Sequence, residues 1–532
     1  MGSQKSFGWQ AKAFAVAGAL LLQGSVAKAE FTLSLPLIAT TDKGTLVGKQ
    51  TGPVKQFLGI PYAAPPVGAK RWQAPAQERS YLLRDATRFA KHCAQPASAF
   101  GEASESEDCL YLNVFAPATL TTLLKPAPVM VWFHPGAFIY GESDDYNPTE
   151  LVKRGVVVVT VNYRLGALGW TAHPGLTAEA TDHTSGNYGL LDQQAALRWV
   201  KRNIRNFGGD PSKVTIFGES AGGVSVYSHL ASPASAGLFH KAIAQSGTYT
   251  MAAPQVTLGE AETKGKALAT ALGCAEDDVA CMRAAPVASI LAKQSKSPTG
   301  YAPNIDGTIL TQPTIVALGT GQFNRVPLLQ GHTHNEFRLF VATLFELQGI
   351  PVTAETYPAA ISAVLNVNSG TANAIATYYY KLSEYPSPSH ALAAIGTDSA
   401  FACSSRTLAR ALTQFTPVYV YEFADENAPQ DVLPPVSFPY GSYHGSEVQY
   451  VLDSRDGAAA FSADQTQLAN HMKSYWTQFA KTGDPNGGAA PAWPAYVHGT
   501  ATSINQLVAP TPQPAGEQHF LYDHRCVFWT GY

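Results

Sequence analysis

The sequence predicts an α/β protein built on one large, mostly parallel sheet with helices on both sides. Short apolar runs rich in β-branched and aromatic residues occupy Tyr111 to Phe115, Val129 to Phe133 and Val156 to Val161, which is typical of strands buried on both faces. The segment Leu190 to Phe207 repeats its apolar residues with a helical period. Alternation of such strands and helices favours a parallel sheet.

Further strand signals recur along the chain, and no Gly/Ser-rich or Pro-rich linker divides it. Two short strands at the start are expected to form an antiparallel lead-in. The Ala-rich stretches 248–320 and 340–404 are predicted to be helical insertions capping the sheet. We therefore expect a single domain over residues 30–532. The additional predicted strands are Gly44 to Gly48, Val54 to Ile60, Val214 to Phe217, Val326 to Leu329 and Pro417 to Phe423.

The composition is that of a globular protein without a large excess of either charge. The 532 residues are 45% hydrophobic and 14% charged, with a formal net charge of -3. Acidic and basic residues are spread along the chain, so no basic patch for nucleic acid is predicted. A small neutral molecule is the expected partner, and the oligomeric state is not predicted.

The N-terminus has the layout of a secretory signal. Lys5 and Lys12 precede an apolar run from Ala13 to Leu22, and Ala27-Lys-Ala29 follows. A membrane span needs about 20 apolar residues, and no run in the sequence reaches that length uninterrupted. We expect cleavage after Ala29, with residues 1–29 as a signal peptide. The protein is expected to be exported, to the periplasm or the medium; the lack of an N-glycosylation acceptor favours a bacterial source.

Six cysteines in an exported chain favour disulfides over free thiols. No Cys-x-x-Cys pair is present, which argues against a structural zinc site of cysteines. Short separations favour pairing Cys93 with Cys109 and Cys274 with Cys281, and this leaves Cys403 for Cys526. The pairing is a hypothesis at this stage.

The pentapeptide Gly-Glu-Ser-Ala-Gly at 218–222 follows a predicted strand and precedes a helix-prone segment. This context predicts a nucleophile elbow, in which a serine lies on a tight strand-to-helix turn between small residues. The N-terminus of the following helix would stabilise an oxyanion. Ser220 is therefore the predicted nucleophile.

A second source of oxyanion donors is predicted where the strand Val129 to Phe133 runs into His-Pro-Gly-Ala-Phe at 134–138. Small residues there let backbone N–H groups approach a substrate oxygen. The predicted donors are the amides of Gly136, Ala137 and Ala221.

The serine needs a base, and the base needs an orienting carboxylate. In this kind of fold they follow in the order serine, acid, histidine. His444 lies in a Gly-flanked loop, whereas the other late histidines, His390, His471, His498, His519 and His524, lack such a setting. Glu336 and Asp425 each follow a predicted strand, and these observations leave both open as the acid.

Two widely spaced motifs resemble those of the type-B carboxylesterase and cholinesterase family, which has the α/β-hydrolase fold. Glu107-Asp-Cys-Leu-Tyr-Leu-Asn113 is similar to one family signature, and the segment from Phe207 to Gly223 is similar to the signature around the nucleophile. The resemblance covers nearly the whole chain after the signal.

The resemblance implies a serine carboxylesterase with the triad Ser220, Glu336 and His444, and so selects Glu336 over Asp425. It implies no cofactor and no metal. It also implies the three disulfides named above and structural ion pairs of Arg71 with Glu107 and of Arg164 with Asp192. Groups expected to support the histidine are Glu219, Ser246 and Glu447.

Two departures from the family pattern limit what the resemblance implies. Pro135 stands where the family usually has glycine, and proline fixes φ and lacks an N–H. The predicted donors at 136 and 137 are untouched, and the sequence does not determine how Pro135 affects the shape of the loop. The loop Ala94 to Asp108 contains no Trp for cation–π binding of a quaternary ammonium, so choline esters are not the expected substrates.

The substrate is expected to be a small ester, and the sequence does not select among aryl, short aliphatic, feruloyl and bulky natural-product or mycotoxin esters. The alternatives are a lipase-like esterase acting at lipid interfaces and a non-catalytic cholinesterase-like binding protein. All three residue types of the triad are present, which favours the enzyme.

Overall fold

A 13-stranded mixed sheet forms the centre of the fold. The computed structural model describes residues 37–119, 125–249, 255–295, 300–430, 432–454, 460–500 and 503–530, so the predicted signal peptide lies outside the described residues. The strands of this sheet are β1 (Leu37–Thr41), β2 (Gly44–Thr51), β3 (Val54–Pro61), β4 (Leu83–Asp85), β5 (Tyr111–Pro117), β6 (Ala127–Phe133), β8 (Val157–Val161), β9 (Gly209–Glu219), β10 (Lys241–Gln245), β11 (Leu328–Thr333), β12 (Val418–Phe423), β14 (Ile504–Leu507) and β15 (Gln513–Ala515).

The strand order is β1-β2-β3-β5-β8-β6-β9-β10-β11-β12-β14-β15, with β4 beside β2. Pairing is parallel from β8 through β14, and β2 and β3 form the antiparallel lead-in that the sequence predicts. Strand β5 is also antiparallel, to both β3 and β8. The predicted mostly parallel sheet is therefore confirmed. The carboxyl ends of β6, β9 and β11 lie along one edge, where ligands bind in open parallel sheets.

One strand prediction needs correction, and one strand of the sheet has no counterpart among the predictions. The strand predicted at Val326 to Leu329 begins at Leu328 and continues to Thr333, because its polar continuation Gln330 to Thr333 is buried between β10 and β12. Strand β10 was not predicted from its short, weakly apolar sequence, Lys-Ala-Ile-Ala-Gln.

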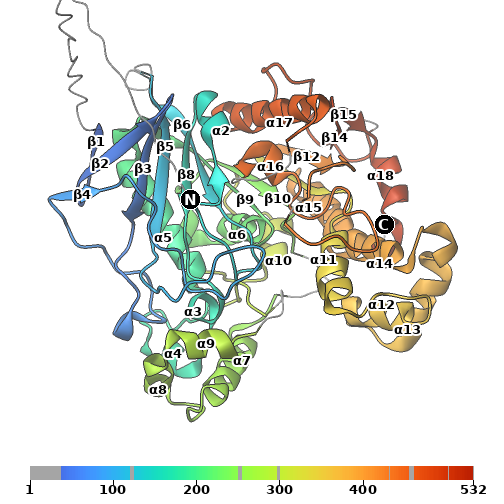
Figure 1. Cartoon of the computed structure of the whole chain (residues 1–532), viewed down its shortest axis with the longest axis horizontal. Helices are drawn as coiled ribbons and strands as arrows, with labels where there is room; N and C mark the ends of the chain where they lie inside the picture. The colour runs from blue at the N-terminus through green and yellow to red at the C-terminus, as the bar shows by residue number, and fades with distance from the viewer. Residues whose placement is uncertain are drawn as a thin grey trace, which may run out of the picture. The chain divides into compact units, whose positions relative to one another are not determined.

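Helices cover both faces of the sheet (Figure 1). Along β6, Val129, Val131 and Phe133 belong to one apolar cluster, while Met130 and Trp132 belong to another. The first cluster includes α5 (Tyr188–Asn203), α6 (Ala221–Ala231) and α15 (Cys403–Leu412), and the second includes α2 (Thr149–Lys153) and α17 (Ala463–Thr482). This alternation explains why the central strands are apolar on both faces.

The two predicted insertions are largely helical, and helices in each contribute to a separate apolar cluster. The helices of the first are α7 (Leu258–Ala271), α8 (Val279–Ala284), α9 (Val287–Lys293) and α10 (Thr314–Gly319). Those of the second are α11 (Phe337–Leu344), α12 (Tyr357–Leu365), α13 (Ser369–Ala374) and α14 (Pro388–Gly396). The remaining helices include α3 (Gly166–Trp170), α4 (Pro174–Glu179), α16 (Val448–Val451), α18 (Glu517–Asp523) and α19 (Cys526–Thr530).

Three disulfides cross-link this framework. They join Cys93 to Cys109, Cys274 to Cys281 and Cys403 to Cys526, the pairs that the sequence favoured. None of the described helices combines the length and apolar character needed to cross a bilayer.

Candidate active site

Ser220 lies on a strained turn between β9 and α6. Its φ of 52° and ψ of -120° place its backbone in a conformation that residues other than glycine rarely adopt. A Cβ at Gly222 would lie 2.0 Å from the carbonyl oxygen of Phe133, and one at Gly218 would lie 2.5 Å from the carbonyl carbon of Gly222. Only glycine fits at both positions, so the shape of this turn requires the two glycines of the GESAG sequence.

His444 and Glu336 are brought together from segments 108 residues apart. Nδ1 of His444 lies 2.5 Å from Oε2 of Glu336, and the other carboxylate oxygen accepts a hydrogen bond from the backbone N–H of Thr333 at 2.8 Å. Glu336 is fully buried in the turn between β11 and α11. A proton on Nδ1 is therefore held by the carboxylate, which leaves Nε2 as the acceptor nitrogen.

A second carboxyl group lies beside the other nitrogen of this imidazole. Oε1 of Glu219 is 3.3 Å from Nε2 of His444, and within the described part of the chain neither atom has a hydrogen-bond partner. Burial alone lowers the pKa of His444, but the charges of Glu219 and Glu336 outweigh it and raise the pKa to about 9. Burial raises the pKa of Glu219 well above its usual range, with His444 opposing the shift.

Glu447 is a third buried carboxyl group near the histidine. Its Oε1 accepts hydrogen bonds from Gln245 Nε2 and from the Tyr421 hydroxyl, each at 3.2 Å. Burial, with a contribution from Glu336, raises the pKa of Glu447 to about 7. Ser246 is also buried, with its backbone N–H bonded to the strand β11 at 2.8 Å. The arrangement stabilises positive charge on the imidazole.

Asp425, the other acid that the sequence left open, makes hydrogen bonds to Tyr450, Gln465 and Asn427 in the described part of the chain, and to no histidine there. Its Oδ2 accepts hydrogen bonds from the Tyr450 hydroxyl at 2.5 Å and from Gln465 Nε2 at 3.1 Å, and its Oδ1 accepts one from the Asn427 N–H. This carboxylate therefore ties together α16 and α17.

Two phenylalanines pack against the His444 ring, and the sequence did not single them out. The ring centroids of Phe340 and Phe401 lie 4.9 Å and 5.2 Å from that of His444. Phe340 is on α11, four residues beyond Glu336, and Phe401 is in a π-helical turn at Thr397–Ala402. The helical spacing from Glu336 is the one signal that could have identified Phe340. These rings exclude water from the imidazole.

The predicted oxyanion loop leaves β6 with three consecutive residues at positive φ: Gly136 at 110°, Ala137 at 55° and Phe138 at 60°. The loop is held by the Tyr163 hydroxyl, which donates to the carbonyl of His134 at 2.7 Å. Among the hydrogen bonds of the described residues, none uses the N–H of Gly136 or Ala137. Both amides are therefore available to a ligand.

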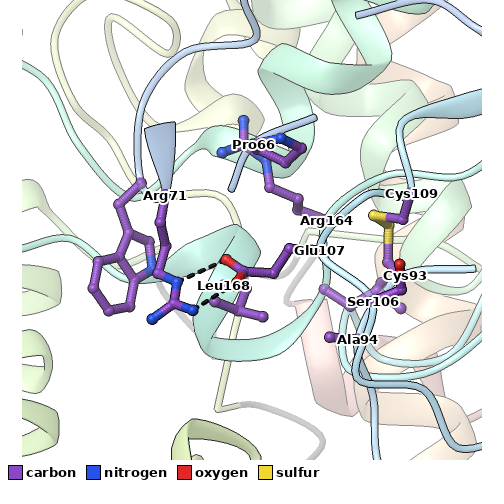
Figure 2. A pocket seen from close by; sticks show the side chains of 11 residues that line it. Pro66, Arg71, Cys93, Ala94, Ser106, Glu107, Cys109, Arg164 and Leu168 are labelled. Atoms are coloured by element: carbon purple, nitrogen blue, oxygen red, sulfur yellow. Dashed lines mark hydrogen bonds and ion pairs between the residues drawn. A yellow bond between two sulfur atoms is a disulfide. The ribbon is translucent and has the colours of Figure 1, made fainter. Parts of the chain in front are cut away.

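The predicted ion pairs lie in the scaffold. Arg71 contacts both carboxylate oxygens of Glu107, at 2.7 and 2.6 Å, and Arg164 contacts those of Asp192, both at 2.8 Å. Figure 2 shows the Arg71–Glu107 pair beside the Cys93–Cys109 disulfide, around a small pocket. Ser220, Glu336 and His444 do not line that pocket, so it is distinct from the candidate active site.

A serine on an elbow after a parallel strand, with an acid and a histidine following in chain order, is the arrangement of the α/β-hydrolase fold. Two solved structures agree with this class. A structure titled PNB esterase has a TM-score of 0.75 and 32% identity, covering 92% of this chain and 100% of that chain. A thermophilic PNB esterase has the same TM-score with 31% identity, and covers 92% of this chain and 100% of that chain.

The chain belongs to the carboxylesterase family, whose sequence model matches residues 35–529. It is 35% identical to fumonisin B1 esterase of Sphingopyxis macrogoltabida over 86% of this chain and 84% of that protein. It is 35% identical to para-nitrobenzyl esterase of Bacillus subtilis (strain 168), over 88% and 94%, and 33% identical to human cocaine esterase, over 92% and 90%. The protein is therefore a carboxylic ester hydrolase.

Proposed function

We propose that this enzyme cleaves carboxylic esters through an acyl-enzyme on Ser220, with His444 as the base and Glu336 as the acid that orients it. The observation that carries this proposal is the Glu336–His444 hydrogen bond. It holds the proton on Nδ1 and leaves Nε2 as the acceptor, in an enzyme whose serine lies on a strained elbow. The triad residues work as one unit in such an arrangement.

In the first step, Nε2 of His444 takes the proton of the Ser220 hydroxyl while Oγ bonds to the ester carbonyl carbon. The carbonyl oxygen becomes an oxyanion. The carbon–oxygen bond to the alcohol then breaks, and the departing alcohol takes the proton from Nε2. Glu336 stabilises the transient imidazolium and keeps its orientation.

In the second step, His444 takes a proton from water while the water oxygen attacks the acyl carbon. The bond to Ser220 Oγ breaks, and the proton returns to the serine. The carboxylic acid leaves. Neither step requires a metal or a cofactor.

The amides of Gly136, Ala137 and Ala221 are proposed to hold the oxyanion. Ala221 begins α6, so its N–H lies at the positive end of that helix. Support for the other two comes from their unused N–H groups and from the positive φ angles that shape the loop. Pro135 precedes both donors and removes neither N–H.

We propose a soluble small ester as the substrate class. The rings of Phe340 and Phe401 beside His444 provide an apolar surface for the acyl or alcohol group. Several ester classes fit such a surface, and the relatives are equally diverse, from fumonisin B1 esterase to para-nitrobenzyl and cocaine esterases.

The enzyme is proposed to be exported, with residues 1–29 removed and 30–532 as one mature domain. Three disulfides support an oxidising location. N-terminal sequencing of the protein recovered from the periplasm or the medium should begin at Glu30. Recovery of full-length protein from the cytoplasm alone would contradict export.

The experiment for the reaction is hydrolysis of p-nitrophenyl esters from acetate to palmitate by wild type and Ser220→Ala in parallel. Covalent labelling by an organophosphonate is measured on the same samples. We expect short-chain hydrolysis and labelling in wild type, and neither in the variant, with equal near-UV circular dichroism. Hydrolysis retained by a folded Ser220→Ala would overturn the assignment, and palmitate preferred at an interface would favour the lipase alternative.

A further inference from the structure

A second cluster of histidines and carboxylates lies behind the Glu336 turn. Its centre is Oε1 of Glu422 on β12, which lies 2.6 Å from Nε2 of His524, 2.9 Å from Nδ1 of His334 and 3.9 Å from Nε2 of His332. A second carboxylate, that of Asp523, lies 3.8 Å from Nδ1 of His334. Three imidazoles and two carboxylates from β11, β12 and the end of α18 thus converge on one point.

The separations suit a bound metal ion. The ligand atoms of His334, Glu422, Asp523 and His524 all lie within 4.8 Å of one another. In a tetrahedral zinc site with bonds of about 2.0 to 2.2 Å, neighbouring ligand atoms are about 3.3 Å apart. The distances of 2.6, 2.9 and 3.8 Å within this cluster lie on both sides of that value. Small side-chain movements would bring all four atoms onto one ion.

The surrounding hydrogen bonds hold the ligands as metal sites require. Nδ1 of His524 lies 2.7 Å from Oδ1 of Asp398, whose other oxygen accepts a hydrogen bond from the Tyr380 hydroxyl at 2.7 Å. A proton held there leaves Nε2 with a lone pair. Oε2 of Glu422 accepts from Gln506 Nε2 at 2.9 Å. A carboxylate behind a ligating histidine is a common feature of zinc proteins.

The hydrogen-bond network does not explain the burial of His332. Its side chain is 1% exposed, and in the described part of the chain neither ring nitrogen has a hydrogen-bond partner. A buried polar group without a partner is costly, and native structures seldom keep one. Its Nε2 points at Glu422 across 3.9 Å. An ion among these residues would give this nitrogen an electropositive partner.

We propose that His334, Glu422, Asp523 and His524 bind one divalent transition-metal ion of the zinc class, with His332 facing the same ion. Two imidazoles and two carboxylates form a ligand set that zinc accepts. The side chains of His334 and Asp523 are 29% and 40% exposed, so the ion has a route from solvent.

The ion would stabilise the fold by linking two segments that are distant in the sequence. His334 lies two residues before Glu336, and His524 lies two residues before Cys526, which is bonded to Cys403. Binding therefore joins the C-terminal segment to the turn that carries the proposed triad acid. The site contributes no group to the ester cleavage described above, so its test is independent of catalysis.

The test uses the full mature chain with its disulfides, without a histidine tag, after dialysis against a chelator. Zinc chloride alone is titrated by calorimetry at pH 7, and bound zinc is counted after gel filtration. We expect one zinc per chain. Cobalt(II) should replace it and give the visible absorption of a four-coordinate ion.

Two variants remove ligands from the exposed side, His334→Gln and Asp523→Asn. Each should weaken zinc binding about tenfold or more and abolish the cobalt spectrum. The matched control is His498→Gln, since His498 also pairs with a buried carboxylate, Glu517, but lies outside the cluster.

Thermal unfolding in chelator checks that the variants are folded, and Asp523→Asn decides the question if His334→Gln does not fold. Zinc should raise the melting temperature of wild type and His498→Gln only. No stoichiometric zinc in wild type, or equal affinity in Asp523→Asn, would overturn the proposal. The cluster would then be an ion-pair network.

Discussion

Nδ1 of His444 lies 2.5 Å from Oε2 of Glu336, while the Thr333 N–H occupies the other oxygen of that carboxylate. The acid is thereby fixed from the end of β11 and cannot rotate away from the ring. This relationship leaves Nε2 of His444 as the nitrogen that can accept a proton.

Replacing this acid by an amide should abolish most activity without unfolding the enzyme. Glu336→Gln is expected to lower kcat on p-nitrophenyl acetate by roughly 10⁴-fold, since the amide favours the wrong imidazole tautomer. Asp425→Asn is the matched control and should reduce stability more than kcat, because Asp425 bonds to Tyr450 and Gln465. Equal losses of kcat in the two variants would contradict the role of Glu336.

The carboxyl group of Glu219 should influence how kcat/KM depends on pH. His444 acts as a base only when neutral, so kcat/KM rises with pH through its pKa, which is raised to about 9. Glu219→Gln removes one of the charges that raise this pKa, and the acidic limb should move to lower pH by about one unit.

The measurement is kcat/KM from pH 5 to 10, using an ester whose background hydrolysis is subtracted. Glu150→Gln breaks only a surface pair with Lys153 and should leave the limb in place. A limb unmoved in Glu219→Gln would show that Glu219 is not charged beside the free imidazole.

The second glycine of the elbow should tolerate no side chain. In Gly222→Ala the new Cβ would meet the Phe133 carbonyl oxygen at 2.0 Å, so we expect loss of organophosphonate labelling together with a clear drop in melting temperature. Gly259→Ala is the control, because no atom lies within 4 Å of its Cβ position on α7. Full labelling in Gly222→Ala would disprove the geometric argument.

Glu517 should stabilise the fold near neutral pH and lose this effect in acid. Burial alone raises the pKa of Glu517, but hydrogen bonds from Tyr496, Gly499, His498 and Arg406 outweigh it and lower the pKa to about 2. Its stabilisation is therefore complete above the unfolded pKa of about 4.3 and is lost as pH falls toward 2.

Glu517→Gln leaves the buried Arg406 unpaired, so unfolding free energy at pH 7 should drop by roughly 3 kcal/mol. Urea unfolding of both proteins at several pH values checks this. The difference between them should shrink below about pH 4; a constant difference would argue that the carboxylate charge is unimportant.

Much of the site was predictable because its signals are local. The elbow needs glycine on both sides of Ser220, and this steric requirement involves only the five consecutive residues 218–222. His444 could be found from its Gly-flanked loop. The choice between Glu336 and Asp425 could not be made this way, since both follow a strand, and it came from the family resemblance.

What was missed depends on contacts between distant segments. His524 has no distinguishing sequence setting, yet the C-terminal disulfide region places it 2.6 Å from Glu422, about a hundred residues away. Phe401 reaches His444 only because a π-helical turn directs it there. Neither contact has a period or spacing that a sequence pattern could detect.

The sequence by itself determined the parallel sheet, the serine elbow and the family, because burial on both faces and tight turns restrict residue type position by position. Only the tertiary structure decided which side chains surround His444 and Glu422. Two carboxyl groups and two aromatic rings lie beside the first residue, and three imidazoles lie around the second. Such convergence depends on the register and packing of distant strands, which residue type alone does not encode.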